Sequence, residues 1–422
     1  MTRTKTRALA NLPNNTVSVK DFGAVGDGVV NDSPAIKTAL EWLFSEQNSQ
    51  KSLYVPSGIY NLEETVDLGS VNPKNSQLAI YGDGATSVFH CNDPNGGIKV
   101  SVFAPSIYLT LDGLQFCPGT GNGGTAFAFW FIYQNVNARN RHTVWMRNCV
   151  ADTLVAENLV DGWIDVFKFH GSARVKIQDT TIWNYWWELD ADGDPVGRMI
   201  DLYNCYNPWM EDVYCNGAGK YGVYNFRESF NEGGNFSNVN IVGTSIGLYI
   251  NQSQNEGESG RHPAIWIRDS HMNCAATNIR VENSSYVLIQ DNVLYSAPRE
   301  HDLPGSPTFI DIFIGDSKGI NILNNAFGSG STEVMDRRHV YVGGTSNSIH
   351  ISDSQLDASC QQQPFYFQPD TSNITVHQPN APSRNTYFKY PDGSAAPIPA
   401  YLTQGAPSDS TYVYRYDVYS TT

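Results

Sequence analysis

The chain has 422 residues, a formal net charge of −15 at pH 7 and a charged fraction of only 16%. This acidic balance disfavours nucleic acid and anionic membranes as partners, because both attract basic surfaces. The hydrophobic fraction of 41% excludes a disordered chain, and polarity comes mainly from uncharged groups, among them 38 Asn.

The seven Cys are scattered along the chain and form no CxxC pair. This spacing predicts neither a disulfide framework nor a zinc site. We therefore expect reduced, mostly buried thiols and a protein without a metal or other cofactor. No stretch approaches the length of a membrane span, so we expect no membrane insertion.

The first elements predict an end cap. Residues 1–16 contain basic residues but no apolar stretch, so we expect a linker and no export signal. Residues 17–22 lead into the Gly-rich segment 23–28, which predicts turns at the cap. It is not a phosphate-binding loop, because no Lys-Ser/Thr pair follows.

Residues 35–44 predict a short amphipathic helix. Asp32 or Ser33 can cap its first turn, which Pro34 also suits. Its apolar face is formed by Ile36, Leu40 and Leu43. Such a helix would close the open end of a solenoid, which otherwise exposes apolar core and unpaired strand edges.

From residue 144 onward, a short alternating strand recurs and ends in Asp, Asn or Gly. Its copies lie at 144–148, 175–179, 239–243, 265–269, 287–291, 320–324 and 349–353, with a degenerate copy at 209–212. A second alternating strand stands ahead of these copies, at 164–169, 199–203, 222–226, 247–250, 278–281, 310–314 and 339–342. Each repeat is too short to be a domain.

Period-two alternation of β-branched and aromatic residues predicts strands with one buried face, and helical periodicity is absent. Short strands repeated without intervening helices are typical of a parallel β-helix. We therefore predict an all-β fold, a single-stranded parallel β-helix with Asn ladders at its turns. A β-sandwich or a propeller is the alternative, but hairpin turns are sparse between the paired strands.

Four longer segments, 184–198, 227–237, 251–263 and 296–307, interrupt the repeats and are rich in carboxylates. Inserted turns project from one face of a solenoid and can form the walls of a groove. Residues 381–422 are rich in Pro and Ser, and we expect them to form an extended C-terminal tail.

The motif DFGAVGDGVVNDSPAIKTAL, followed by LYVPSGIYNL and IYGDGA, closely resembles the start of the pectate-lyase-like β-helix domain. That domain occurs in phage tailspikes, capsule depolymerases, polysaccharide-acting enzymes and epimerases. The resemblance implies a right-handed, pectin-lyase-like β-helix over residues 17–380. The preceding segment resembles the join between a virion-attachment region and a spike body, which makes residues 1–16 the linker between them.

The densest candidate site lies in the first insertion, where aromatic residues stand beside acids. Pyranose rings stack on aromatic side chains, and carboxylates bind hydroxyls or supply acid and base. The candidate stacking residues are Trp183, Tyr185, Trp186 and Trp187, and the candidate acids are Glu188, Asp190, Asp192 and Asp194. Core or trimer-interface aromatics beside a solvated turn or a calcium loop remain the alternative interpretation.

Acids in other segments extend the candidate site. Asp161 lies just before a strand, in a segment that resembles in part the Asp-rich coil of polygalacturonase-type glycosidases. Glu228 and Glu232 lie four residues apart in the second insertion, beside Arg227. Acids in equivalent turns of adjacent coils can reach the roughly 5–9.5 Å separation that glycoside hydrolysis requires. Solvated surface acids on variable loops are the alternative.

Two mechanisms are open. Because acids outnumber bases in the insertions, we expect a glycoside hydrolase that cleaves an internal bond with paired carboxylates. In a polysaccharide lyase, a Tyr, His or Lys would remove the proton α to a uronate carboxylate, which Arg198 or Arg227 would neutralise. A glycan-binding receptor spike without catalysis is the third hypothesis.

The resemblance also implies a location and partners. It implies a phage tailspike on the virion that acts at the outer surface of the host bacterium. The expected partners are a bacterial surface polysaccharide (capsule or O-antigen), two further copies of the chain in a homotrimer, and other tail or baseplate proteins.

Overall fold

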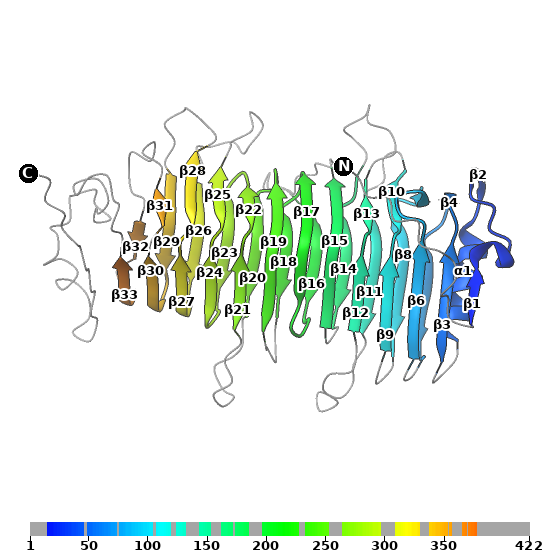
Figure 1. Ribbon diagram of the computed structural model, residues 1–422, viewed down its shortest axis with the longest axis horizontal. Coiled ribbons are helices and arrows are strands. Elements are labelled where there is room, and N and C mark those ends of the chain that lie inside the picture. The colour runs from blue at the N-terminus through cyan, green and yellow to red at the C-terminus, as the bar shows by residue number, and fades with distance from the viewer. Residues whose placement is uncertain are drawn as a thin grey trace, which may run out of the picture.

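Short alternating segments become strands that pair in parallel with the strand one coil further along the chain. The computed structural model describes residues 15–45, 49–73, 76–103, 107–119, 124–131, 143–152, 162–171, 174–184, 196–227, 233–252, 264–296, 309–329, 337–352, 354–356, 365–368 and 370–377. Their strands stack along the long axis of the molecule, from α1 at one end to β33 at the other (Figure 1). The predicted parallel β-helix is confirmed.

One face of the solenoid is an 11-stranded sheet in the described part of the chain, called sheet B here. Its strands are β5 (Val66–Val71), β8 (Gly96–Val102), β11 (Thr125–Phe131), β14 (Asp165–His170), β16 (Arg198–Tyr203), β18 (Tyr221–Phe226), β20 (Ile246–Asn251), β23 (Thr277–Glu282), β26 (Phe309–Gly315), β29 (Arg337–Gly343) and β32 (Phe365–Phe367). All seven predicted second strands lie here, from the segment at 164–169 to the one at 339–342.

The remaining described strands form sheet A, which bends along its length into two limbs. The first limb contains β1 (Thr16–Ser18), β3 (Gln50–Val55), β6 (Ser76–Gly82), β9 (Ile107–Asp112), β12 (Thr143–Arg147), β21 (Ile265–Arg268), β24 (Val287–Gln290), β27 (Lys318–Leu323), β30 (Asn347–Ser352) and β33 (Ser372–His377). The second contains β2 (Asp27–Asn31), β4 (Gly58–Leu62), β7 (Ser87–Cys91), β10 (Gln115–Pro118), β13 (Val150–Ala151), β22 (His271–Asn273), β25 (Val293–Ser296), β28 (Ala326–Ser329) and β31 (Gln355–Leu356). Three longer strands run through the bend: β15 (Arg174–Asn184), β17 (Trp209–Gly217) and β19 (Gly234–Val242).

The bend explains why the repeated strand ends in Asp or Asn. The residues at the bend adopt a left-handed conformation with φ between 46° and 57°, which Asp and Asn tolerate better than other side chains. These bend residues are Asn148, Asp179, Asp212, Asn238, Asp269, Asp291 and Asn324. The predicted copy at 239–243 was wrong in register: its bend is Asn238, so that segment follows the bend instead of preceding it.

Side chains repeat along the axis inside the coils. Asn292 Nδ2 donates to Asn325 Oδ1 at 2.9 Å, and Asn325 Nδ2 donates to the Ile289 carbonyl at 3.0 Å. These bonds confirm the predicted Asn ladder and satisfy backbone groups that turn inward. The six described Cys are buried and form no disulfide with one another, as expected from their spacing.

The N-terminal end is covered by α1 (Ser33–Phe44), which follows the short 3-10 helix η2 (Val19–Phe22). The helix buries Ile36, Leu40 and Leu43, which were predicted as its apolar face. Asp32 makes no side-chain bond to the helix. Its carboxylate instead accepts the backbone N–H groups of Val25, at 2.7 Å, and of Gly26, at 3.2 Å. The predicted cap residue therefore fixes the Gly-rich turn.

No helix in the described part of the chain is long and apolar enough to cross a membrane. The predicted linker at 1–16 lies outside the described residues except for Asn15 and Thr16, and the predicted tail at 381–422 lies wholly outside them.

Candidate functional site

Sheet B presents polar and aromatic side chains at its outward positions. Alternation sends residues such as Phe167 and Ile200 inward, where they are buried, and leaves the positions between them facing out. One outward column contains, in register, Lys168, Asp201, Tyr224 and Tyr249. The neighbouring column contains Trp130, His170, Tyr203 and Phe226.

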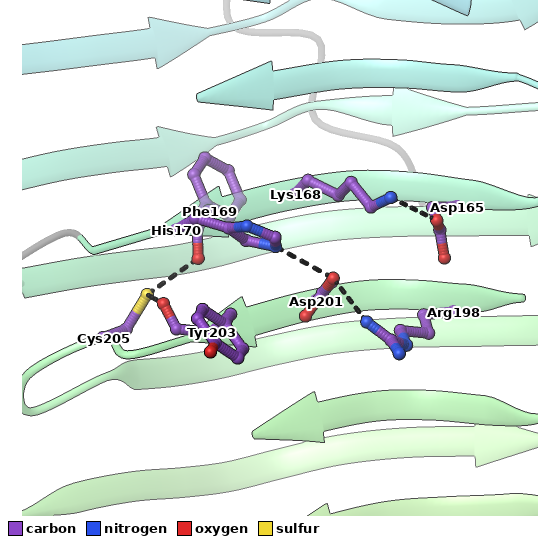
Figure 2. Close-up of polar contacts among 8 residues, drawn as sticks. All are labelled: Asp165, Lys168, Phe169, His170, Arg198, Asp201, Tyr203 and Cys205. Atoms are coloured by element: carbon purple, nitrogen blue, oxygen red, sulfur yellow. Dashed lines mark hydrogen bonds and ion pairs between the residues drawn. The ribbon is translucent and has the colours of Figure 1, made fainter. Parts of the chain in front are cut away.

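Asp201 is the centre of this surface. Its Oδ2 lies 3.0 Å from His170 Nε2 and 2.8 Å from Arg198 Nη1 (Figure 2). The carboxylate is 0% exposed, whereas the His170 and Arg198 side chains both remain partly exposed. Because the carboxylate lies beneath the two groups that it binds, it holds them in place without itself facing solvent.

The environment of Asp201 keeps it charged. Burial raises the pKa of Asp201, but the hydrogen bond from His170 and the charge of Arg198 outweigh it and lower the pKa below its usual value. Burial lowers the pKa of Arg198, while Asp201 more than reverses this effect. A carboxylate with a lowered pKa, bonded at Nε2 of His170, leaves Nδ1 of the ring as the basic nitrogen.

Further contacts fix the edges of the cluster. Lys168 Nζ lies 2.5 Å from Asp165 Oδ2 at the start of the same strand (Figure 2). The Arg198 guanidinium lies over the Tyr224 ring, 4.0 Å from its centroid, which limits how far it can move. Burial is the main cause that raises the pKa of Tyr224.

Aromatic rings surround His170. The Trp130 ring stacks near it with centroids 5.9 Å apart, and the Tyr203 ring lies 5.2 Å away. Cys205 Sγ contacts the Phe169 carbonyl on the same strand as His170 (Figure 2). The cluster therefore brings together an imidazole, a guanidinium and aromatic rings, which can act on an anionic ligand through charge and stacking.

The same columns continue toward the C-terminal coils. Tyr249 Oη donates to Glu282 Oε2 at 2.8 Å, and Arg280 Nη2 donates to Glu282 Oε1 at 2.6 Å. The Tyr224 and Tyr249 rings stack with centroids 5.1 Å apart and so connect the two groups of polar residues. Sheet B thus offers an extended polar and aromatic surface on both sides of Asp201.

The structure places three of the residues predicted for the site. Arg198 belongs to the Asp201 cluster on sheet B, and its predicted contact with substrate stays a prediction. Trp183 lies instead on sheet A, half-buried against Tyr214 with ring centroids 5.3 Å apart. Arg227 is 1% exposed, and its Nη2 contacts the Gly233 carbonyl at 3.4 Å. Burial lowers the pKa of Arg227 to about 10 and leaves the side chain almost no exposed surface. This burial disfavours the predicted contact between Arg227 and substrate, which stays a prediction.

The other predicted site residues lie outside the described residues. They are Asp161, Tyr185, Trp186, Trp187, Glu188, Asp190, Asp192, Asp194, Glu228 and Glu232. Their segments join directly to sheet B in the chain, because 153–161 and 185–195 precede β14 and β16 and 228–232 follows β18. They stay predictions.

Sequence reasoning missed His170, Asp201, Tyr203 and Tyr224. Asp201, Tyr203 and Tyr224 lie inside predicted strands, and His170 directly follows one. Alternation alone did not decide whether these side chains face the core or the solvent. The signal that could have found them is a polar residue at the same alternating position in successive copies, such as Lys168 and Asp201. Among the described residues, no group of three or more His, Cys, Asp or Glu side chains is arranged to hold a metal ion.

Comparison with known families assigns the chain. The model of the family described as "Rhamnogalacturonase A/epimerase, pectate lyase-like" matches residues 16–299, more than half of the chain. The chain belongs to this family. A curated relative, the non-secreted LysM effector LysM15 of Penicillium expansum, is 26% identical over 133 residues. That match spans 30% of this chain and only 9% of the relative's length.

Solved structures share the fold at low identity. The A-module of the mannuronan C-5 epimerase AlgE6 of Azotobacter vinelandii is 14% identical with a TM-score of 0.59, over 94% of this chain and 99% of that chain. An exopolygalacturonase of Thermotoga maritima is 14% identical with a TM-score of 0.50, over 87% and 92%. Tailspike protein 3 of bacteriophage CBA120 is 9% identical with a TM-score of 0.50, over 96% and 60%. These neighbours share the parallel β-helix fold, and the family model assigns the chain to the pectate-lyase-like class.

Proposed function

We propose that the chain cleaves a uronate-containing polysaccharide by β-elimination at the surface of sheet B. The observation that carries this proposal is the binding of His170 and Arg198 to one buried carboxylate, that of Asp201. A base and a cation held at fixed positions suit the removal of a proton α to a carboxylate.

Each residue has a role in that reaction. Nδ1 of His170 takes the proton from the carbon beside the uronate carboxylate. The electron pair left on that carbon forms a double bond as the bond to the glycosidic oxygen breaks, and the departing oxygen gains a proton. Arg198 neutralises the uronate carboxylate with donors that Asp201 does not use, since a guanidinium has five. Asp201 holds both residues and stays ionised.

Hydrolysis by paired carboxylates is the second candidate, favoured by the rhamnogalacturonase in the family description. Its predicted acids are Glu188, Asp190, Asp161, Glu228 and Glu232. Asp201 is a poor substitute, because a buried carboxylate with a lowered pKa neither gives a proton nor reaches a sugar carbon.

The biological setting that we propose is a phage tailspike. Support comes from the resemblance of the N-terminal segment to a spike join and from the fold shared with a bacteriophage tailspike protein. In this setting the chain would work as a homotrimer beside other tail or baseplate proteins and degrade capsule or O-antigen at the surface of the host. Sedimentation of the full chain tests the trimer, since a monomer mass would contradict it.

The reaction is tested by incubating the purified chain with polygalacturonate, alginate and bacterial capsular polysaccharides that contain uronates. Elimination yields an ultraviolet-absorbing unsaturated uronate at the new chain end. New reducing ends without that absorbance would refute elimination and favour hydrolysis. Binding without either product would favour a receptor spike.

A further inference from the structure

Three Trp side chains lie on the outward face of sheet A, on a different sheet from the Asp201 cluster. Trp145, Trp209 and Trp266 occupy equivalent positions of β12, β17 and β21. Backbone pairing joins them through Lys176 and Asn235, in the order Trp145, Lys176, Trp209, Asn235, Trp266. We call these five residues the tryptophan column.

The spacing of the column is set by the backbone. Parallel strands lie about 4.8 Å apart, so successive Trp residues, two strands apart, are separated by about 9.6 Å. The three indoles therefore extend over about 19 Å along the solenoid axis. A single sugar ring is too short to contact two of them, so the spacing suits a linear polymer that lies along the axis.

Two of the three indoles are exposed to solvent despite their size, and Trp145 is half-buried. Trp209 is 43% exposed and Trp266 is 48% exposed. Large aromatic side chains are usually covered, because their burial contributes strongly to stability. Two exposed indoles at equivalent positions of one column indicate a ligand-binding surface. Exposed residues without such a role would be scattered over the surface.

Cations are placed between and beside these rings. Lys176 Nζ lies 5.2 Å from the Trp145 centroid and 5.2 Å from the Trp209 centroid. Arg147 lies over Trp145 at 4.4 Å, and its charge is shared with Asp112 at 2.8 Å. In a chain of net charge −15, a cation between two indoles and a second cation beside Trp145 are complementary to an acidic ligand.

Acids border the column on one side. Glu211 accepts a hydrogen bond from Gln178 at 2.7 Å on the adjacent outward positions. The exposed bend residues Asp179, Asp212 and Asp269 lie further along the same strands. An acidic polymer would be repelled across the bend and would therefore lie parallel to the axis, along the indoles.

We propose that the tryptophan column is a second glycan-binding surface, which holds an acidic polysaccharide chain while another part of that chain occupies sheet B. The choice of a uronate polymer rests on the proposed function. A subunit interface is the competing use of an exposed aromatic strip. The cores of interfaces are depleted of charged residues, however, whereas Lys176 stands between Trp145 and Trp209 in this column.

The test is affinity electrophoresis of the full chain through gels that contain polygalacturonate or alginate, with dextran as a neutral probe. We expect the wild type to be retarded by the two acidic polymers. The double variant Trp209→Ala/Trp266→Ala should bind them about tenfold more weakly, because two stacking contacts are lost. Lys176→Gln should weaken binding of the acidic polymers and lower its dependence on salt. Tyr108→Ala, an exposed aromatic of the same sheet outside the column, is the matched control and should bind as the wild type does.

Three results would overturn the proposal: equal retardation of the wild type and the double variant, no retardation of the wild type by either acidic polymer, or a change from oligomer to monomer in the double variant. Thermal unfolding confirms that the variants are folded. The assay measures binding alone, so a failure of the elimination reaction leaves its result intact. If elimination occurs, the double variant should raise KM for the polymer and leave KM for a short oligouronide unchanged.

Discussion

Asp201 shows how a single residue can organise a surface without touching a ligand. Its carboxylate is completely buried, yet it lies at an outward position of sheet B and binds both His170 and Arg198. Removal of one residue of a buried ion pair leaves the charge of the other uncompensated. This lowers the stability of the fold by more than an exposed ion pair contributes to it. Its two partners therefore depend on it for position.

The role of His170 as a base leads to a prediction for activity. His170→Ala should lower kcat on a polyuronate by about 10²–10⁴-fold, the usual contribution of a general base. His350→Ala, on the outward face of sheet A, is the control and should keep full activity. Initial rates of ultraviolet-absorbing product measure both. An active His170→Ala variant would remove this residue from the mechanism.

The lowered pKa of Asp201 predicts how stability depends on pH. Because its folded pKa lies below the unfolded value of about 3.8, the stabilisation from its charge is complete above about pH 4 and is lost as the pH falls through the folded pKa. Asp201→Asn should be less stable than the wild type at neutral pH and should lose less stability in acid. Thermal unfolding of both proteins between about pH 3 and pH 7 measures this difference, and parallel curves would contradict it.

Bend residues allow a test of backbone strain. Asp269 has a φ of 53°, a conformation that costs a residue with a Cβ about 1–2 kcal/mol unless it is Asn or Asp. Asp269→Ala should therefore reduce the free energy of unfolding by about 1 kcal/mol, whereas Asp269→Gly should change it little. Urea denaturation of the two variants distinguishes them. Equal losses would show that the side chain matters more than the backbone.

At the scale of elements, the sequence predicted strands better than it predicted the site. Alternation identified the seven strands of sheet B from β14 to β29, because one buried face leaves a period-two signal. It did not separate the two limbs of sheet A around Asn238, because strands on both sides of a bend alternate alike. It also missed His170 and Asp201, since their meeting depends on the pairing of β14 with β16. That register is a long-range property, fixed by how whole coils stack.

The end cap is the element that can be tested most directly. Leu43 lies on the buried face of α1 and is completely buried. Its truncation leaves a cavity that the rigid coils beside it cannot fill. Leu43→Ala should reduce the free energy of unfolding by about 2–5 kcal/mol. Glu41→Ala, on the exposed side of the same helix, should have little effect. Chemical denaturation compares the two, and a mild effect of Leu43→Ala would show that α1 contributes little to closing the solenoid.

The described coils form a stack in which the strands of each coil pair with those of its neighbours. Stability in such a stack is approximately a sum of coil and interface contributions. Hydrogen exchange should therefore be slowest in the central strands β15, β17 and β19, and faster in β30 and β33 near the C-terminal end of the described coils. Mass spectrometry of exchanged peptides measures this gradient. Uniform protection along the axis would indicate that the solenoid opens as one unit.

Parallel pairing has a consequence for how the surface could change over time. Every outward side chain is held at a multiple of one strand spacing, because the peptide hydrogen bonds between neighbouring strands fix that spacing. Trp145, Trp209 and Trp266 lie on every second strand of the stack. A column for a ligand with a different repeat could not arise through small shifts of these residues. It would need aromatic residues at positions shifted by whole coils. Gain or loss of a coil would lengthen or shorten the solenoid without altering its strand spacing.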